Sequence, residues 1–181
     1  LARIMAQQES LAIAGAHGKT TTTGMISLML EKAGLKPSIV IGGLLPQIGA
    51  NAKIGSGRYL ISEADESDGS FLILHPKMAV ITNIERDHLD FYENLNRIID
   101  AFEKFVQQLP QDGFAIVGLD NEIVADMVKR IPGHYIGFGL QNADADYQAV
   151  DIVLHKNGST CTILERGEML GQLDLQVPGK H

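Results

Sequence analysis

The sequence predicts an α/β domain with a mainly parallel sheet flanked by helices and a small antiparallel β appendage near the C-terminus. Three observations predict it: short apolar or β-branched runs recur along the chain, helical patterns separate them, and a hairpin pattern follows them. Strands that alternate with helices are typical of a parallel sheet. The 181 residues suit one domain, with the α/β core over about 1–145 and the antiparallel sheet over about 146–178.

The predicted parallel strands are apolar nearly throughout, which is typical of strands that are buried on both faces of a sheet. They are Leu11–Ala14, Ser38–Ile41, Tyr59–Ser62, Met78–Thr82, Phe114–Val117 and Tyr135–Phe138. In the appendage, Tyr147–His155 and Thr160–Glu165 form a predicted hairpin around Asn157-Gly158, and Leu170–Val177 is a predicted third antiparallel strand.

Three amphipathic helices are predicted between these strands. The first ends at Gly34, the second at Pro110 and the third at Pro132-Gly133, because glycine and proline commonly follow the last helical turn. Their apolar stripes are Met25, Leu28, Met29 and Ala33; Leu95, Ile98, Ile99, Phe102, Val106 and Leu109; and Ile123, Val124, Met127, Val128 and Ile131. The aromatic residues Phe102, Phe105, Tyr135 and Phe138 follow the same periods and are predicted to be core.

The composition argues against several classes of protein. Fifteen Lys and Arg against 22 Asp and Glu give a net charge of −7, which disfavours nucleic acid or an anionic membrane as the main partner. No apolar run approaches the roughly 18 residues that span a bilayer, and no secretory signal pattern is present. Cys161 is the single cysteine, so an internal disulfide is excluded. We expect a cytoplasmic protein; because the chain begins at Leu1, we also expect it to be a piece of a longer one.

The strongest local motif is Gly15-Ala16-His17-Gly18-Lys19-Thr20, which lies between a predicted strand and a helix that starts near Thr20. Glycines let backbone N–H groups approach phosphate oxygens, and the helix N-terminus adds unpaired donors. Lys19 would contact the β- and γ-phosphates and Thr20 a magnesium ion. The loop is shorter than the usual phosphate-binding motif. Four threonines from Thr20 to Thr23 begin a helix poorly, so we expect their hydroxyls to face an anion.

Two further polar motifs follow buried strands. Glu63-Ala64-Asp65-Glu66-Ser67-Asp68 comes after Tyr59–Ser62, and Thr82-Asn83-Ile84-Glu85-Arg86-Asp87-His88 begins where Met78–Thr82 ends. Alone, the first could be a solvated loop and the histidine of the second a structural one. Ligands of open α/β sheets bind beyond the carboxyl ends of strands, so the convergence of three motifs predicts one crevice. One carboxylate of the first motif could share magnesium with the phosphate loop.

Together the three motifs resemble the central ATPase domain of the Mur ligases, the cytoplasmic amide-forming enzymes of peptidoglycan precursor synthesis. Within that family, the acidic hexapeptide, the second motif and the terminus Val177-Pro178-Gly179-Lys180-His181 look most like the members that join L-alanine to UDP-N-acetylmuramate. The resemblance covers the whole chain but only the middle of three domains. It implies that the N-terminal UDP-sugar domain and the C-terminal domain are absent, that the isolated chain is inactive, and that an adenine contact follows His181.

The resemblance also implies ATP and Mg²⁺ as cofactors and a role for each matching residue. Lys19 would hold the β- and γ-phosphates, Thr20 and Glu63 one magnesium ion, and His88 a second metal ion. Asn83 would lie beside the γ-phosphate as a catalytic residue with Lys19 and His88. The nucleotide would contact Gly15, Ala16, His17, Gly18, Lys19, Thr20 and Thr21, although Ala16 replaces the family's usual threonine. For the carbamoylated lysine of many relatives, Lys104 is only a loose candidate and Glu103 its alternative.

The implied reaction proceeds through an acyl phosphate of the muramate, which the amine of L-alanine then attacks. Other readings remain open. The chain could belong to a peptide-recycling muramate ligase, or to a folylpolyglutamate synthase-like enzyme. It could also be a non-catalytic nucleotide-binding switch, which would bind Mg-ATP through the same residues without consuming it.

Overall fold

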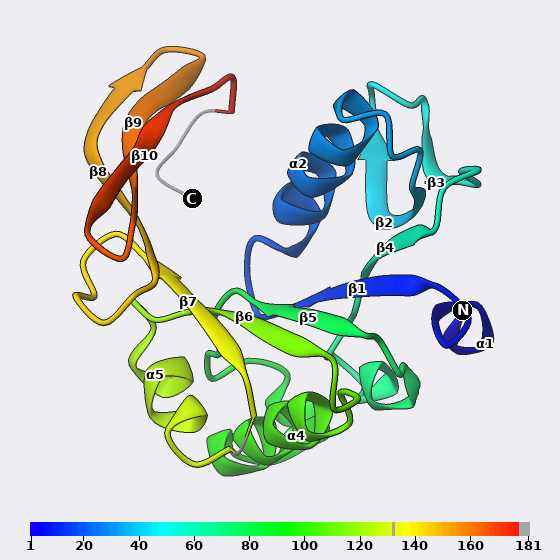
Figure 1. Cartoon of the computed structure of the whole chain (residues 1–181). Helices are drawn as coiled ribbons and strands as arrows, with labels where there is room; N and C mark the ends of the chain where they lie inside the picture. Colours follow the sequence, from blue (N-terminus) through cyan, green and yellow to red (C-terminus); the bar gives the residue numbers. More distant parts are fainter. Residues whose placement is uncertain (132, 178–181) are drawn as a thin grey trace.

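The computed structural model describes residues 1–131 and 133–177 and shows one ten-stranded sheet in the order β10-β9-β8-β7-β6-β5-β1-β4-β2-β3 (Figure 1). Its centre is parallel, and all six predicted strands are confirmed. They are β1 (Glu9–Ala14), β2 (Ser38–Leu45), β4 (Tyr59–Glu63), β5 (Met78–Ile81), β6 (Phe114–Gly118) and β7 (Tyr135–Gly139). The α/β prediction is therefore correct.

The antiparallel appendage consists of β8 (Tyr147–His155), β9 (Gly158–Glu165) and β10 (Glu168–Leu175). It continues the main sheet, because β8 pairs in parallel with β7. His155 pairs with Gly158, so the hairpin turn lies at Lys156 and Asn157, one residue earlier than predicted. A short antiparallel edge strand, β3 (Ala50–Lys53), was not predicted. The end of the appendage at residue 178 and the terminal motif over 178–181 lie outside the described residues.

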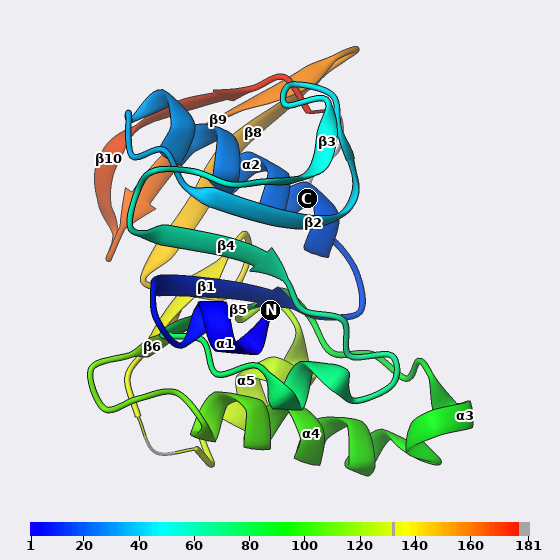
Figure 2. The same ribbon diagram turned by 90° about the vertical axis from the view of Figure 1, so that its right-hand side faces the viewer.

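Helix α2 (Lys19–Lys32) covers one face of the sheet, whereas α4 (Leu95–Gln107) and α5 (Glu122–Val128) cover the other (Figures 1 and 2). The short segments α1 (Ala2–Met5), η1 (Ser70–Ile73) and α3 (Leu89–Tyr92) were not predicted. The predicted stop at Pro132 lies outside the described residues. None of the described helices has the length and apolar composition needed to cross a membrane.

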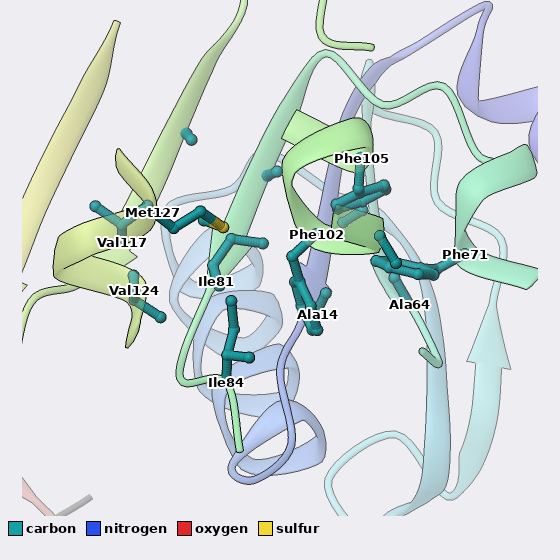
Figure 3. Packing of buried hydrophobic residues seen from close by; sticks show 14 of the residues in the cluster. Ala14, Ala64, Phe71, Ile81, Ile84, Phe102, Phe105, Val117, Val124 and Met127 are labelled. Carbon is teal, nitrogen blue, oxygen red and sulfur yellow. The ribbon is translucent and has the colours of Figure 1, made fainter. Parts of the chain in front are cut away.

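The larger hydrophobic core lies between the sheet and helices α4 and α5. Phe71 packs against Phe102 and Phe105 with ring centroids 5.2 and 4.8 Å apart, and all three are buried (Figure 3). The predicted core positions of Phe102 and Phe105 are thus confirmed. Phe138 is only half-buried, against the smaller core, and Tyr135 is 45% exposed at the start of β7, so its predicted core position was wrong.

Helix α2 buries a different face from the one its apolar stripe predicted. Met29 is 56% exposed, whereas Thr23, Gly24 and Ser27 are buried. A Cβ on Gly24 would lie 3.3 Å from Leu45 Cδ1, so small residues are needed where the helix approaches β2. Thr23 therefore faces the protein interior and not an anion, contrary to the prediction.

Candidate functional site

The three polar motifs meet because their strands are neighbours. Strands β5, β1 and β4 lie side by side and run in parallel, so their carboxyl ends reach the same edge of the sheet. Ligands of open α/β sheets bind at this edge. The phosphate loop, the acidic loop and the end of β5 therefore come together at one edge of the sheet, where the sequence predicts a crevice.

The phosphate loop connects β1 to α2, which begins at Lys19, one residue before the predicted start. Gly18 is the residue before the helix and has a φ of +83°, a conformation that favours glycine. Its carbonyl accepts the Thr22 N–H at 2.9 Å. The loop thus leads into the start of a 14-residue helix, and N–H groups in the first turn of a helix lack partners within the helix and can bind anions.

The end of β5 holds the loop in place. The His17 N–H donates to Asn83 Oδ1 at 2.9 Å, and Asn83 Nδ2 donates to the His17 carbonyl at 3.0 Å. Thr82 Oγ1 donates to the same carbonyl at 2.7 Å, and the Ala16 N–H donates to the Asn83 carbonyl at 3.2 Å. The side chain of Asn83 therefore binds the loop backbone through both its oxygen and its nitrogen.

A hydroxyl and a carboxylate lie together at the first turn of α2. Thr20 Oγ1 lies 3.0 and 3.1 Å from the two carboxylate oxygens of Glu63, and Glu63 Oε2 accepts the Gly42 N–H at 2.8 Å. Hard oxygen donors of this kind suit Mg²⁺, which takes few protein ligands and completes its shell with water and phosphate oxygens. The Thr20 hydroxyl and the Glu63 carboxylate therefore fit an ion that phosphate oxygens help to bind. Within residues 1–131 and 133–177 no three His, Cys, Asp or Glu side chains are placed to hold a metal by themselves.

The acidic loop supplies a second carboxylate that the site prediction did not include. Lys19 Nζ donates to the Gly15 carbonyl at 2.7 Å and to Glu66 Oε1 at 2.8 Å. Glu66 is only 2% exposed. His88 Nε2 lies 3.8 Å from the same oxygen, and His88, the residue before α3, has a φ of +51°. The structure thus brings the predicted residues Lys19 and His88 together through Glu66.

Tyr92 holds the backbone of Glu66 in place. Its hydroxyl donates to the backbone carbonyl of Glu66, and the Gly69 N–H donates to the same carbonyl at 3.1 Å. Burial, and then the negative charge of Glu66, raise the pKa of Tyr92 to about 12. The phenol therefore remains a hydrogen-bond donor at neutral pH.

Several predicted positions lie away from these contacts. The His17 side chain is 68% exposed and its Nε2 lies 3.4 Å from Glu85 Oε2. Thr21 is half-buried. Glu103 binds Arg130 at 2.6 Å, and Lys104 lines a surface hollow beside α3 and α4. Within the described residues, neither Glu103 nor Lys104 forms a hydrogen bond or an ion pair with His88, and the place of the carbamoylated lysine stays a prediction.

The sequence shows that Glu66 belongs to an acidic motif near the phosphate loop, but it does not show that Glu66 is the residue that binds Lys19. Four carboxylates lie within six residues of the acidic loop, and the sequence does not distinguish which of them is buried. Of these four, only Glu63 is assigned to magnesium, and that assignment comes from the resemblance to the Mur ligases. The structure places Glu63 at the end of β4 and Glu66 in the turn behind it.

Comparisons with known proteins agree with the geometry. Residues 13–181 match the family described as Mur ligase middle domain. UDP-N-acetylmuramate–L-alanine ligase from Dictyoglomus turgidum is 48% identical over 182 residues, which cover 100% of this chain and 39% of that protein. The same enzyme from Aquifex aeolicus is 45% identical, again over 100% of this chain and 40% of that protein. The chain thus spans about two fifths of the length of these relatives.

Solved structures show the same fold. The UDP-N-acetylmuramate-alanine ligase of Thermotoga maritima has a TM-score of 0.83 at 28% identity and matches 97% of this chain and 38% of that one. A UDP-N-acetylmuramate:L-alanyl-γ-D-glutamyl-meso-diaminopimelate ligase from Neisseria meningitides has a TM-score of 0.84 at 26% identity, over 98% of this chain and 58% of that one. The two ligases are similar to this chain to nearly the same degree in fold. From its motifs, its fold and its matched residues, the chain belongs to the Mur ligase family, to whose middle domain residues 13–181 correspond.

Proposed function

We propose that this chain is the ATP-binding domain of a cytoplasmic ligase that joins L-alanine to the carboxylate of UDP-N-acetylmuramate. The observation that carries the proposal is the site itself, in which Lys19 and the Thr20–Glu63 pair meet at the start of α2. The name shared by relatives that are 45–48% identical over the whole chain supports the choice of substrates.

In the proposed reaction, an oxygen of the muramate carboxylate attacks the γ-phosphorus of ATP, and the bond to the β–γ bridging oxygen breaks. ADP leaves with that electron pair, and an acyl phosphate remains. The amine of L-alanine then attacks the acyl carbon, phosphate leaves, and the nitrogen loses a proton as the amide forms. Such chemistry needs positioning and charge neutralisation more than a protein nucleophile.

The residues of this chain would supply that environment. The residues of the phosphate loop, 15–21, would enclose the phosphates, and Lys19 would offset the charge of the transferred phosphoryl group. Thr20 and Glu63 would hold a magnesium ion, which when bound neutralises phosphate charge. His88 would hold a second metal ion next to the buried carboxylate of Glu66. For Asn83 we propose that it acts by holding the loop, because its amide is bonded to the His17 backbone.

The remaining parts of the reaction need protein outside this chain. Because the relatives are about two and a half times as long, we propose that an N-terminal domain holds the UDP-sugar and a C-terminal domain helps to bind the amino acid.

The first experiment measures phosphate release from Mg-ATP by the full-length protein with UDP-N-acetylmuramate. L-alanine, glycine, L-serine and the L-Ala-γ-D-Glu-diaminopimelate tripeptide are added one at a time. We expect release that depends on both the UDP-sugar and L-alanine. Release with the tripeptide alone would identify a recycling ligase instead, and no release despite Mg-ATP binding would leave a nucleotide-binding switch.

The variant Lys19→Ala tests whether that activity depends on this site. We expect it to abolish turnover. Because it also leaves the buried carboxylate of Glu66 without its ammonium partner, we expect a lower melting temperature, and turnover is measured at a temperature at which this variant and its control are both folded. Lys32→Ala is the matched control, because it removes the same charge from the exposed far end of the same helix. If Lys19→Ala retained the rate of Lys32→Ala, the site assignment would be wrong.

A further inference from the structure

Glu66 stands apart from the other charged residues of the described chain, because it is the only one of them that is buried. Removing a carboxylate from water costs several kcal/mol unless a partner compensates. The compensation here is the ammonium of Lys19, whose side chain is itself only 14% exposed. Tyr92 and Gly69 hold the Glu66 carbonyl, so the backbone that carries the carboxylate is fixed.

The two oxygens of this carboxylate have different surroundings. Oε1 accepts from Lys19 Nζ at 2.8 Å and lies 3.8 Å from His88 Nε2. Oε2 is buried and has no hydrogen-bond partner in the described structure. A carboxylate that only stabilised the fold would be expected to use both oxygens, since an unsatisfied buried acceptor costs about 1–3 kcal/mol. The arrangement instead concentrates the contacts of Glu66 on Lys19.

The ammonium group of Lys19 has one N–H donor that neither Gly15 nor Glu66 uses. An ammonium group has three N–H donors, and two of them are occupied by the Gly15 carbonyl and by Glu66 Oε1. These two contacts fix the direction of the third. A flexible lysine would have to be ordered when the nucleotide binds, whereas this one is already ordered.

We propose that Glu66 is a positioning residue, which holds the ammonium of Lys19 so that its remaining donor meets a phosphate of the bound nucleotide. The proposal rests on the proposed function, because it takes the loop of Gly15 to Lys19 as the phosphate site. Positioning and simple charge repulsion predict opposite effects of removing Glu66 on nucleotide binding. A carboxylate near a polyphosphate repels it, so its removal would strengthen binding if Glu66 did not position Lys19.

The test measures the dissociation constant of a non-hydrolysable Mg-ATP analogue by calorimetry in the full-length protein. Glu66→Ala should weaken binding on the order of tenfold, the equivalent of one charge-assisted hydrogen bond. Glu66→Gln should recover part of the loss, because its amide oxygen can still accept from Lys19. Asp65→Asn is the matched control: it makes the same charge change on an exposed neighbour and should leave the affinity unchanged.

A double-variant comparison separates positioning from a structural role. In a Lys19→Ala background, Glu66→Ala should no longer weaken binding, because the residue through which Glu66 acts is gone and only the repulsion between its carboxylate and the phosphates is removed. Equal losses in both backgrounds would overturn the proposal. Tighter binding by Glu66→Ala, or a lower melting temperature with unchanged affinity, would overturn it as well. If the wild type binds the analogue but releases no phosphate with L-alanine, the proposed function fails while this comparison can still be made.

Discussion

The first glycine of the phosphate loop allows a prediction that depends directly on the geometry. Gly15 is buried, has a φ of +137°, and lies against the end of β5. A Cβ at this position would lie 2.1 Å from Thr82 Oγ1 and 2.9 Å from the Asn83 carbonyl oxygen. The substitution Gly15→Ala therefore has to displace both groups.

Two contributions set the magnitude. The positive φ costs a residue with a Cβ about 1–3 kcal/mol, and forcing an extra methyl group into a packed site costs about 1–3 kcal/mol more. Thr82 could rotate away only by losing its hydrogen bond to the His17 carbonyl, and the Asn83 oxygen belongs to the backbone. We expect a loss of about 2–6 kcal/mol in the free energy of unfolding, a large fraction of the stability of a typical domain.

Gly18→Ala is the matched control in the same loop. Gly18 also has a positive φ, +83°, but the nearest atom to its added Cβ is Thr22 Oγ1 at 4.0 Å. Only the backbone contribution applies, so we expect a loss of about 1–2 kcal/mol. Urea denaturation followed by circular dichroism measures both. If Gly15→Ala destabilised the chain no more than Gly18→Ala, the contact with Thr82 would not be the reason that a glycine is needed.

Two further predictions concern the groups around the loop. Asn83→Ala should lower the free energy of unfolding by about 1–3 kcal/mol, because two hydrogen bonds to His17 are lost. Asn83→Asp should not restore it, since a second carboxylate oxygen would face the His17 carbonyl; thermal melting checks both, and a wild-type melting curve for Asn83→Ala would refute the role of Asn83. The raised pKa of Tyr92, about 12, means that the unfolded chain loses this proton first. The contribution of Tyr92 to stability is therefore complete below about pH 10 and is lost as the pH rises to about 12, by at most about 2–3 kcal/mol. Urea titrations across this range should show that slope in the wild type and not in Tyr92→Phe.

The parallel strands could be predicted because each is an apolar run that ends at a polar turn, and strands buried on both faces leave that pattern. The edge strand β3 could not, since Ala50–Lys53 is mostly exposed and carries no apolar run. The buried face of α2 was predicted wrongly for a different reason. Periodicity reports apolar residues, whereas the approach to β2 selects small ones such as Gly24 and Ser27.

The candidate site was predictable as a place but not as a set of contacts. Each polar motif directly follows a strand, so a parallel sheet brings the motifs together whatever their side chains do. The hydrogen bonds between Asn83 and His17 depend on how close the end of β5 lies to the phosphate loop, and the sequence alone does not give that distance. The same limit applies to Glu103, whose ion pair with Arg130 the sequence does not indicate.

The acidic loop shows why the missing information matters for function. Glu63 and Glu66 are the same residue type three positions apart, yet one faces a hydroxyl at the rim and the other an ammonium in the interior. The difference follows from the chain leaving β4 at Glu63 and turning back beneath Tyr92. A half-buried carboxylate beside Thr20 remains free to exchange its hydrogen bonds for a cation. A buried carboxylate beside Lys19 cannot do so without leaving that ammonium unpaired. The two positions are therefore suited to different tasks, one to binding an exchangeable ion and the other to holding a fixed charge in place.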